Sequence, residues 1–154
     1  MFVGRYEVKL DAKNRVIVPQ KLREVRDPPG EMHSEFYLSL GNEGCIYVYT
    51  PRGWEDLMKQ FGATQASASE SLRKLQRMVA ANTVPCSCDA QGRIVIPADF
   101  RRHADLKRNV LWVGAVSRAE IWSVERWREL ESRDAAAGED LRIATDAGFA
   151  LPGS

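Results

Sequence analysis

Residues 6–23 read YEVKLDAKNRVIVPQKLR, and residues 84–101 read VPCSCDAQGRIVIPADFR. At a constant offset of 78 residues, the two segments share an Asp-Ala-x-x-Arg motif followed by three β-branched residues and a proline. The identical pairs are Asp11/Asp89, Ala12/Ala90, Arg15/Arg93, Pro19/Pro97 and Arg23/Arg101. Self-similarity at a fixed offset is the signature of an internal repeat, so the chain is predicted to contain two copies of one structural unit.

A second pair of segments extends this repeat at an offset of 73 residues. Residues 37–41 (YLSLG) match 110–114 (VLWVG), and residues 48–54 (VYTPRGW) match 121–127 (IWSVERW). The change of offset places five extra residues in the first copy. The segment Asp27-Pro-Pro-Gly-Glu31 is the obvious insertion, because Pro-Pro-Gly is typical of a surface loop.

Each copy shows the same order of local patterns. An alternating segment such as 6–10 precedes the Asp-x-x-x-Arg motif, and the β-branched run after the motif suits a strand. Pro19 and Pro97 suit the first position of a short helix, where no N–H bond is lost. Two further strands and a helix that contains Trp54 or Trp127 complete each copy. We therefore predict strand, strand, short helix, strand, strand and helix, twice over.

The predicted organisation has four parts. Residues 1–60 form the first copy, 61–82 a helical linker, 83–131 the second copy, and 132–154 a disordered tail. Ser67 or Ser69 can cap the linker helix, which has an apolar stripe on one face. The tail is rich in Ala and Gly and carries too little apolar mass to order itself.

Within each motif, the sequence predicts a tight turn. Gly92 accepts a positive φ without a Cβ penalty, and Asn14 is the next-best residue at the equivalent position. Asp side chains commonly accept backbone N–H bonds across such turns, so Asp11 and Asp89 are expected to shape the two corners. We call the two turns corner 1 (residues 11–15) and corner 2 (residues 89–93).

The arginines of the two corners are candidate nucleic-acid contacts. Arg15 and Arg93 could fork onto a phosphate or a guanine edge, or each could form a structural ion pair with its aspartate. Lys9 and Lys13 flank corner 1, and Arg5 precedes them, within a segment 1–26 that holds seven cations against three anions. Because the whole chain has a formal net charge of +1, this basic segment is concealed in a near-neutral total.

Several other classes of function find no support. The chain has no Gly-rich phosphate loop and no Gly-x-Ser-x-Gly or His-Glu-x-x-His motif, so it is not expected to be an enzyme, to bind a small-molecule substrate or to need a cofactor. Neither His33 nor His103 has the spacing that would complete a zinc site with Cys86 and Cys88, so no metal is expected. No window approaches the roughly 20 apolar residues of a membrane helix, and no signal peptide is recognised, so a cytoplasmic location is expected.

Taken together, these segments resemble the MraZ family, which belongs to the AbrB-like (SpoVT-AbrB, swapped-hairpin) DNA-binding superfamily. The resemblance rests on the opening Met1-Phe-x-Gly4, on both corners, on the Val-Pro and Ile-Pro that follow them, and on the segment Glu120-Ile-Trp-Ser-x-Glu-Arg-Trp127. Asn14 departs from the Gly that many members carry, and the insertion at 27–31 is a further departure.

The resemblance implies an α+β, β-rich fold. Two tandem swapped-hairpin units would interleave into one pseudo-dimeric β-barrel within the chain, flanked by short helices. It also implies a ring-forming homo-oligomer that binds repeated promoter boxes of the division and cell-wall gene cluster, its own gene included, mainly as a repressor. Such a protein would work at the nucleoid.

The resemblance assigns DNA contact to Arg15 and Arg93, with Lys13 beside them. Gln91 stands where corner 1 has Lys13, so corner 2 is expected to be less basic. The alternative is an AbrB-type antitoxin-like module whose task is to hold a partner protein. Such antitoxins usually have one hairpin unit and a long tail, whereas this chain has two units and a short acidic tail.

Overall fold

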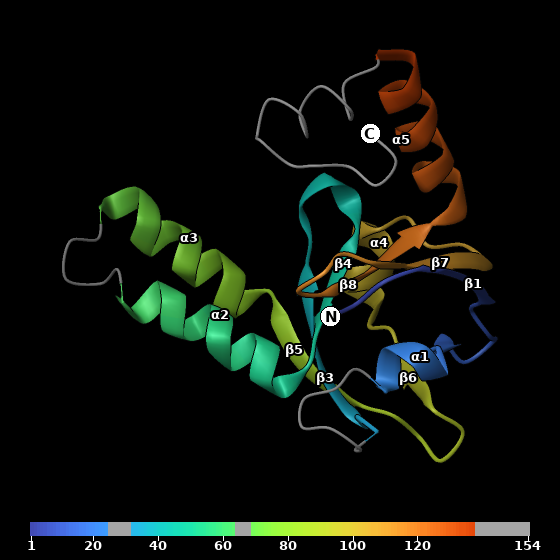
Figure 1. Cartoon of the computed structure of the whole chain (residues 1–154), viewed down its shortest axis with the longest axis horizontal. Coiled ribbons are helices and arrows are strands. Elements are labelled where there is room, and N and C mark those ends of the chain that lie inside the picture. The colour runs from blue at the N-terminus through green and yellow to red at the C-terminus, as the bar shows by residue number, and fades with distance from the viewer. Residues whose placement is uncertain (25–31, 64–68, 138–154) are drawn as a thin grey trace. The chain divides into compact units, whose positions relative to one another are not determined.

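A computed structural model describes residues 1–24, 32–63 and 69–137 of the chain (Figure 1). The chain divides into two compact units, Met1–Ser123 and a second unit that begins at Val124. The first unit contains all the strands of both copies, and the described part of the second is one helix. The loop insertion 27–31 and residues 138–154 lie outside the described residues.

The first copy follows the predicted order of elements. Its strands and helices are β1 (Arg5–Lys9), β2 (Arg15–Ile17), α1 (Gln20–Arg23), β3 (Glu35–Leu40), a 3-10 turn η1 (Asn42–Gly44), β4 (Ile46–Tyr49) and α2 (Pro51–Ala63). The second copy follows helix α3 (Glu70–Ala81) and comprises β5 (Thr83–Ser87), β6 (Arg93–Val95), α4 (Ala98–His103), β7 (Asn109–Gly114), β8 (Ala119–Ser123) and α5 (Val124–Ala137).

The strands form a six-stranded antiparallel sheet, in the order β1-β7-β8-β4-β3-β5, and a two-stranded ribbon of β2 and β6. The first strand of each copy pairs with a strand of the other copy: β1 of the first copy lies beside β7, and β5 of the second copy lies beside β3. The order is palindromic, so β1, β7 and β8 are the equivalents of β5, β3 and β4 about a pseudo-two-fold axis. This confirms the predicted mixed α+β fold with two interleaved units.

The strands that flank each corner separate after the turn instead of forming a long hairpin. A backbone hydrogen bond closes each turn. Asp11 N donates to Arg15 O at 2.9 Å in corner 1, and Asp89 N donates to Arg93 O at 2.8 Å in corner 2. Beyond the turn, β2 leaves β1 and pairs with β6. Of the two strands that flank each corner, one thus joins the sheet and the other joins the ribbon.

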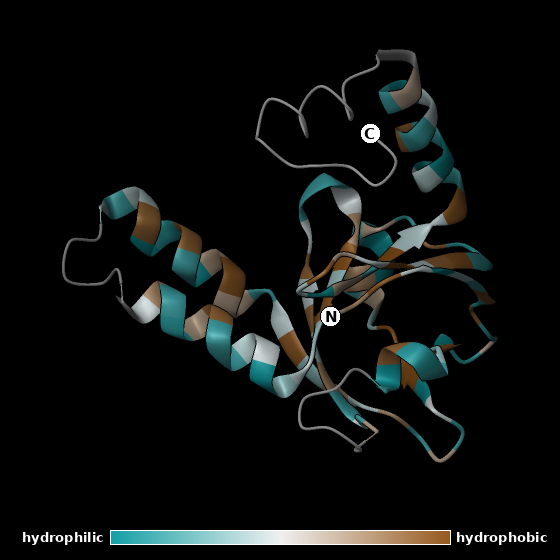
Figure 2. Ribbon diagram, viewed as in Figure 1, coloured by the Kyte–Doolittle hydropathy of each residue, from teal (hydrophilic) through white to brown (hydrophobic). Residues whose placement is uncertain are grey.

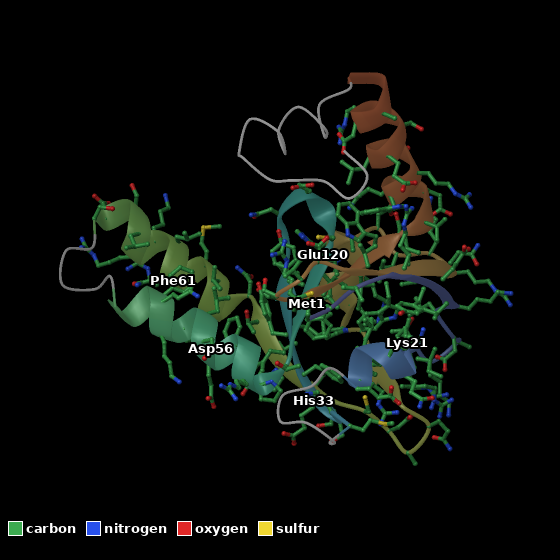
Figure 3. The ribbon with its side chains drawn as sticks, in the orientation of Figure 1. Met1, Lys21, His33, Asp56, Phe61 and Glu120 are labelled. Carbon is green, nitrogen blue, oxygen red and sulfur yellow. The ribbon has the colours of Figure 1, made fainter. Side chains whose placement is uncertain are left out.

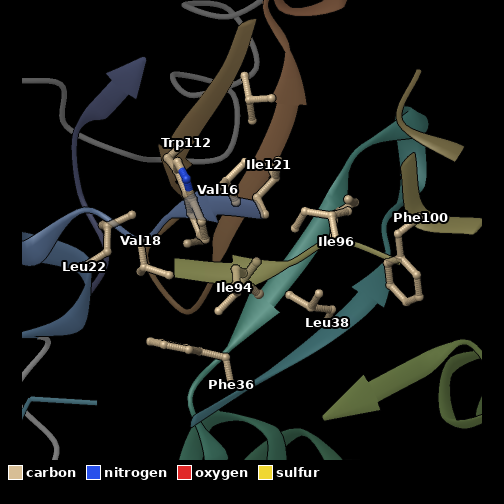
Figure 4. Close-up of a cluster of buried hydrophobic side chains, with 14 of the residues drawn as sticks. Val16, Val18, Leu22, Phe36, Leu38, Ile94, Ile96, Phe100, Trp112 and Ile121 are labelled. Atoms are coloured by element: carbon tan, nitrogen blue, oxygen red, sulfur yellow. The ribbon is translucent and has the colours of Figure 1, made fainter. Parts of the chain in front are cut away.

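The ribbon and the sheet enclose one hydrophobic core. Val16 of β2 and Ile94 of β6 are 1% and 0% exposed, and they lie among Trp112, Phe36 and other side chains of the sheet (Figure 4). Burying each such aliphatic or aromatic side chain stabilises the fold by about 1.5–3 kcal/mol. Because both copies contribute to this core, neither copy has a hydrophobic core of its own.

The two short helices begin one residue later than the sequence predicts. Pro19 and Pro97 occupy the N-cap position, and the helices start at Gln20 and Ala98. A proline at the N-cap costs no helical hydrogen bond, because its nitrogen precedes the first bonded turn. Leu22 and Phe100 bury their side chains in the shared core.

The segment between the copies forms the second helix of a packed pair. Ser69 caps α3, since its hydroxyl accepts a hydrogen bond from Leu72 N at 3.3 Å. The Gln76 side chain donates to the carbonyl of Phe61 on α2 at 2.9 Å, which joins the two helices. Phe61 is labelled in Figure 3. Both helices carry alternating hydrophobic and hydrophilic bands (Figure 2). Helix α2, the last helix of the first copy, runs to residue 63, past the boundary expected at residue 60.

Helix α5 runs from Val124 to Ala137. Its last turns cover residues 132–137, which the sequence assigned to a disordered tail. A run of Ala residues favours helix once a preceding helix has supplied the nucleus, which explains the extension. Among the described residues, none of the helices is long and apolar enough to cross a membrane.

Candidate nucleic-acid interface

Corner 1 is a turn built around the carboxylate of Asp11. Its Oδ1 accepts hydrogen bonds from the backbone N–H groups of Lys13 and Arg15, both at 2.9 Å. Asn14 has φ 62°, and its N–H donates to the Asp11 carbonyl at 3.0 Å. A short polar side chain tolerates this left-handed conformation better than most residues do. The aspartate thus fixes the backbone that carries Arg15.

Corner 2 repeats the arrangement. Asp89 Oδ1 accepts from Gln91 N at 3.0 Å and from Arg93 N at 2.9 Å. Gly92 has φ +77°, and a Cβ at this position would collide with the guanidinium of Arg23. The positive φ is therefore the main reason for glycine in corner 2, since the guanidinium lies at the end of a flexible side chain that can shift.

The turn hydrogen bonds favour the ionised form of both carboxyl groups. The backbone N–H of Arg15 lowers the pKa of Asp11, and the Arg15 side chain and the Lys13 N–H lower it further. The backbone N–H of Arg93 lowers the pKa of Asp89 in the same way. Both aspartates are therefore negative at neutral pH and can hold a cation.

The four charged side chains of the corners form one network. Arg15 Nε donates to Asp11 Oδ2 at 2.8 Å, and Arg93 Nε donates to Asp89 Oδ2 at 2.8 Å. Across the ribbon, Arg15 Nη1 lies 3.9 Å from Asp89 Oδ2, and Arg93 Nη1 lies 4.0 Å from Asp11 Oδ2. We call these residues, Asp11, Arg15, Asp89 and Arg93, the corner network.

The corner network orients the two guanidinium groups without burying them. The side chains of Arg15 and Arg93 remain 25% and 30% exposed. Arg93 also donates from Nη2 to the Gln91 side chain at 3.1 Å. The sequence left two interpretations of the arginines, ion pair or nucleic-acid contact. The structure contains the ion pairs and also leaves part of each arginine side chain at the surface, so the two roles are compatible.

Lys9 and Lys13 lie where the sequence expects them, beside corner 1. Both are exposed, Lys9 at the end of β1 and Lys13 within the turn. Arg5 begins β1 opposite Val113, while Lys9 ends the strand opposite Asn109. Four residues of strand separate them by about 13 Å. The structure therefore does not bring Arg5 to corner 1.

Two cations of the second copy join corner 1, and sequence reasoning missed them. Leu10 N donates to the carbonyl of Arg108 at 2.8 Å, which places the exposed pair Lys107 and Arg108 beside the corner. They lie at least 92 residues (107 − 15) from corner 1 in sequence, and the pairing of β1 with β7 brings them close. An alignment of the two copies that also allowed for strand exchange could have found them.

The equivalent positions around corner 2 are uncharged or acidic. Cys88 N donates to the carbonyl of Ser34 at 2.7 Å, as Leu10 N does to that of Arg108, so Ser34 is the counterpart of Arg108. The structural offset here is 74 residues (108 − 34), one more than the offset of 73 expected from the sequence. Ser87 pairs with Glu35 where Lys9 pairs with Asn109. Arg23, beside Gly92, has its repeat mate in Arg101, so this pair adds no difference between the copies. Corner 1 is accordingly the more basic of the two.

The cysteines and histidines of the chain lie in packed positions. Burial raises the pKa of the Cys86 thiol to about 12, so this group is neutral at neutral pH. His103 Nε2 lies 2.8 Å from the carbonyl of Gly41, and the His33 ring packs edge-on against Phe36. Within the described part of the chain, no three His, Cys, Asp or Glu residues come together as a metal site.

The family model and the similar proteins all point to the same family. The family model described as "MraZ protein, putative antitoxin-like" matches twice, over residues 1–78 and 79–147. A protein of Lachnoclostridium phytofermentans called "Transcriptional regulator MraZ" is 40% identical over 127 residues, which are 82% of this chain and 84% of that protein. Proteins of the same name from Thermoanaerobacter and from Lactiplantibacillus plantarum are each 36% identical over 141 residues, 92% of this chain and 94% and 95% of those proteins.

Proposed function

Because this chain belongs to the MraZ family, whose relatives bear the name of transcriptional regulators, we propose that it binds double-stranded promoter DNA through its corners. The proposed targets are repeated boxes in the promoter of the division and cell-wall gene cluster, including the chain's own gene, and the proposed outcome is repression. The place of action is then the cytoplasm, at the nucleoid.

The corner network is the observation that supports this proposal. It presents two arginines of one ribbon, each held by an aspartate through its Nε at 2.8 Å. A guanidinium that is already oriented loses less side-chain entropy when it binds a phosphate or a guanine edge. The aspartates would thus prepare the arginines for DNA, although they carry charge of the wrong sign to touch it.

The lysines and arginines around corner 1 supply the sequence-independent part of the affinity. Lys9, Lys13, Lys107 and Arg108 are exposed cations beside this corner. Contacts of such residues with phosphates position a protein on DNA but carry no sequence information. Each phosphate that they neutralise is expected to make log K fall by about 0.9 per decade of salt concentration.

Assembly would provide the remaining affinity. A single corner with a few cations binds one box weakly, whereas several chains held in a ring can engage successive boxes at once. The ring itself is part of the proposal, since it rests on the resemblance to the family. Such a protein would bind DNA that carries several boxes much more tightly than DNA that carries one.

The experiment that tests this function is footprinting on the DNA upstream of the chain's own gene. We expect a protected region that disappears as the salt concentration is raised. The variant Arg15→Gln should lose protection, while Lys74→Ala, which removes an exposed cation from α3, should keep it. Failure of the wild-type protein to protect any site in this region, at low salt and with a folded protein, would contradict the proposal.

A further inference from the structure

The outer face of the β2–β6 ribbon carries two exposed apolar side chains. Ile17 is 48% exposed and Val95 is 55% exposed, whereas their neighbours Val16 and Ile94 are fully buried on the inner face. Since successive residues of a strand point to opposite sides, Ile17 and Val95 share the outer face with the two corner arginines. We call Arg15, Ile17, Arg93 and Val95 the ribbon face.

The strand register sets each apolar side chain directly opposite an arginine. Arg15 pairs with Val95, and Ile17 pairs with Arg93. Residues opposite each other in an antiparallel pair have Cβ atoms about 5 Å apart. The ribbon face is therefore a compact patch with pseudo-two-fold symmetry, in which an apolar group and a guanidinium alternate on both strands.

Folding does not require apolar residues at these two places. The strand positions would be served equally well by Thr, which is β-branched and soluble. A single exposed Ile or Val is ordinary on a protein surface. Here, however, each copy of the repeat places one opposite the corner arginine of the other copy, so that the two apolar side chains and the two arginines form one patch. Arginines on both sides of this patch make it suitable for a partner that combines negative charge with small apolar groups.

We infer that Ile17 and Val95 contact the 5-methyl groups of thymine in the major groove of DNA. This inference rests on the proposed function and adds to it the residues that read sequence. The major groove is about 12 Å wide and admits a two-stranded β-ribbon. The thymine methyl is the apolar group that this groove displays. On each strand, the arginine then binds phosphate or guanine, and the apolar side chain covers an adjacent thymine.

The test replaces thymine by uracil, which lacks only the 5-methyl group. The probe is the duplex protected in the footprint, made once with dT and once with dU at every thymine, and its affinity is measured by fluorescence anisotropy. Covering one methyl group is expected to contribute about fourfold in affinity. The wild-type protein should therefore bind the dU duplex at least fourfold more weakly than the dT duplex.

The matched variant is Ile17→Thr/Val95→Thr, which keeps β-branched residues in both strands. It should bind dT and dU duplexes equally, with an unchanged salt dependence, because the cations remain. Val3→Thr changes an exposed valine outside the ribbon, 60% exposed, and should keep the preference for dT. The midpoint of thermal unfolding should be the same for all three proteins.

Two results would overturn the inference and leave the proposed function standing. One is a wild-type protein that protects its footprint but binds both duplexes equally. The other is a double variant that still prefers dT but forms a smaller assembly by light scattering, since the ribbon face would then join copies of the chain. A protein without any footprint would instead refute the proposed function, and the inference with it.

Discussion

Arg15 lies between two carboxylates, 2.8 Å from Asp11 Oδ2 through its Nε and 3.9 Å from Asp89 Oδ2 through its Nη1. The first contact is local to corner 1, and the second crosses to corner 2. Because Arg93 makes the reciprocal pair of contacts, the two corners are joined into one surface. The duplication of the motif therefore builds within one chain a site that a single copy does not contain.

The acid limb of the stability curve should report on the corner aspartates. Their pKa values are lowered in the folded state, so the unfolded chain binds more protons as the pH falls. The stability they contribute is complete above their unfolded pKa, near 3.9, and is lost as the pH drops through the lower folded value. Asp11→Asn should be less stable than wild type at pH 7.

The stability difference between Asp11→Asn and wild type should shrink as the pH is lowered below about 4, where the wild-type carboxyl becomes protonated and loses its charge. Urea denaturation of both proteins at a series of pH values measures it. Lys74→Ala serves as the control, since no pH-dependent difference is expected for it in this range. A gap between Asp11→Asn and wild type that stays constant down to pH 2 would show that the charge of Asp11 is not what stabilises the turn.

The buried carboxylate of Glu120 should matter for stability rather than for DNA binding. Glu120 is 8% exposed, and its carboxylate accepts hydrogen bonds from Arg118 Nη2 at 2.7 Å and from Trp122 Nε1 at 2.9 Å. Without Glu120, the buried Trp122 N–H loses its acceptor, which costs about 1–3 kcal/mol, whereas the Arg118 side chain is 28% exposed and can be solvated. Glu120→Ala should therefore lower the free energy of unfolding by about 2 kcal/mol.

Glu120→Gln is the matched variant, because the amide oxygen can still accept one hydrogen bond. It should be less destabilising than Glu120→Ala in the same urea titration. Equal losses for the two variants would mean that packing, and not the polar contacts, accounts for the effect.

Shortening a side chain on the inner face of the ribbon should cost much more stability than shortening one on the outer face. Ile94→Ala removes a fully buried side chain and should cost about 2–5 kcal/mol. Val95→Ala, on the next residue, truncates a side chain that is 55% exposed and should change stability by less than about 0.5 kcal/mol. Urea denaturation of the two variants gives the comparison. A large cost for Val95→Ala would show that the ribbon face is covered.

The difference in charge between the corners should appear in the salt dependence of DNA binding. Arg108→Ala and Lys13→Ala should each reduce the slope of log K against log salt by about 0.9, if each contacts one phosphate. Ser34→Ala and Gln91→Ala change the equivalent positions of corner 2 and should leave the slope unchanged. Equal effects at both corners would contradict the greater role given to corner 1.

Much of the fold follows from local patterns in the sequence. The repeat defines two copies, and the β-branched runs after each motif predict β2 and β6. The positive φ of Asn14 and Gly92 follows from the need for a tight turn. The pairing of strands does not follow from these patterns, because an alternating segment fits any neighbour that offers an apolar face. Resemblance to a family supplied the interleaving that periodicity could not.

The candidate site was predicted in part, for the same reason. Residues close in sequence, such as Asp11, Lys13 and Arg15, could be assigned to one corner. Arg108 could not, because it reaches corner 1 only through the pairing of β1 with β7. Arg5 was grouped with the corner by its place in a basic segment, but the extended strand carries it to the far end of β1. Charge counted along a sequence says little about charge gathered in space.

The central claim is that the oriented arginines of the corners bind DNA, and one measurement tests it most directly. It is the affinity of Arg15→Gln for the duplex upstream of the chain's own gene, compared with wild type and with Lys74→Ala, at one salt concentration and with folding checked by circular dichroism. We predict at least a tenfold loss for Arg15→Gln and wild-type affinity for Lys74→Ala. A folded Arg15→Gln protein that binds as tightly as wild type would contradict the claim.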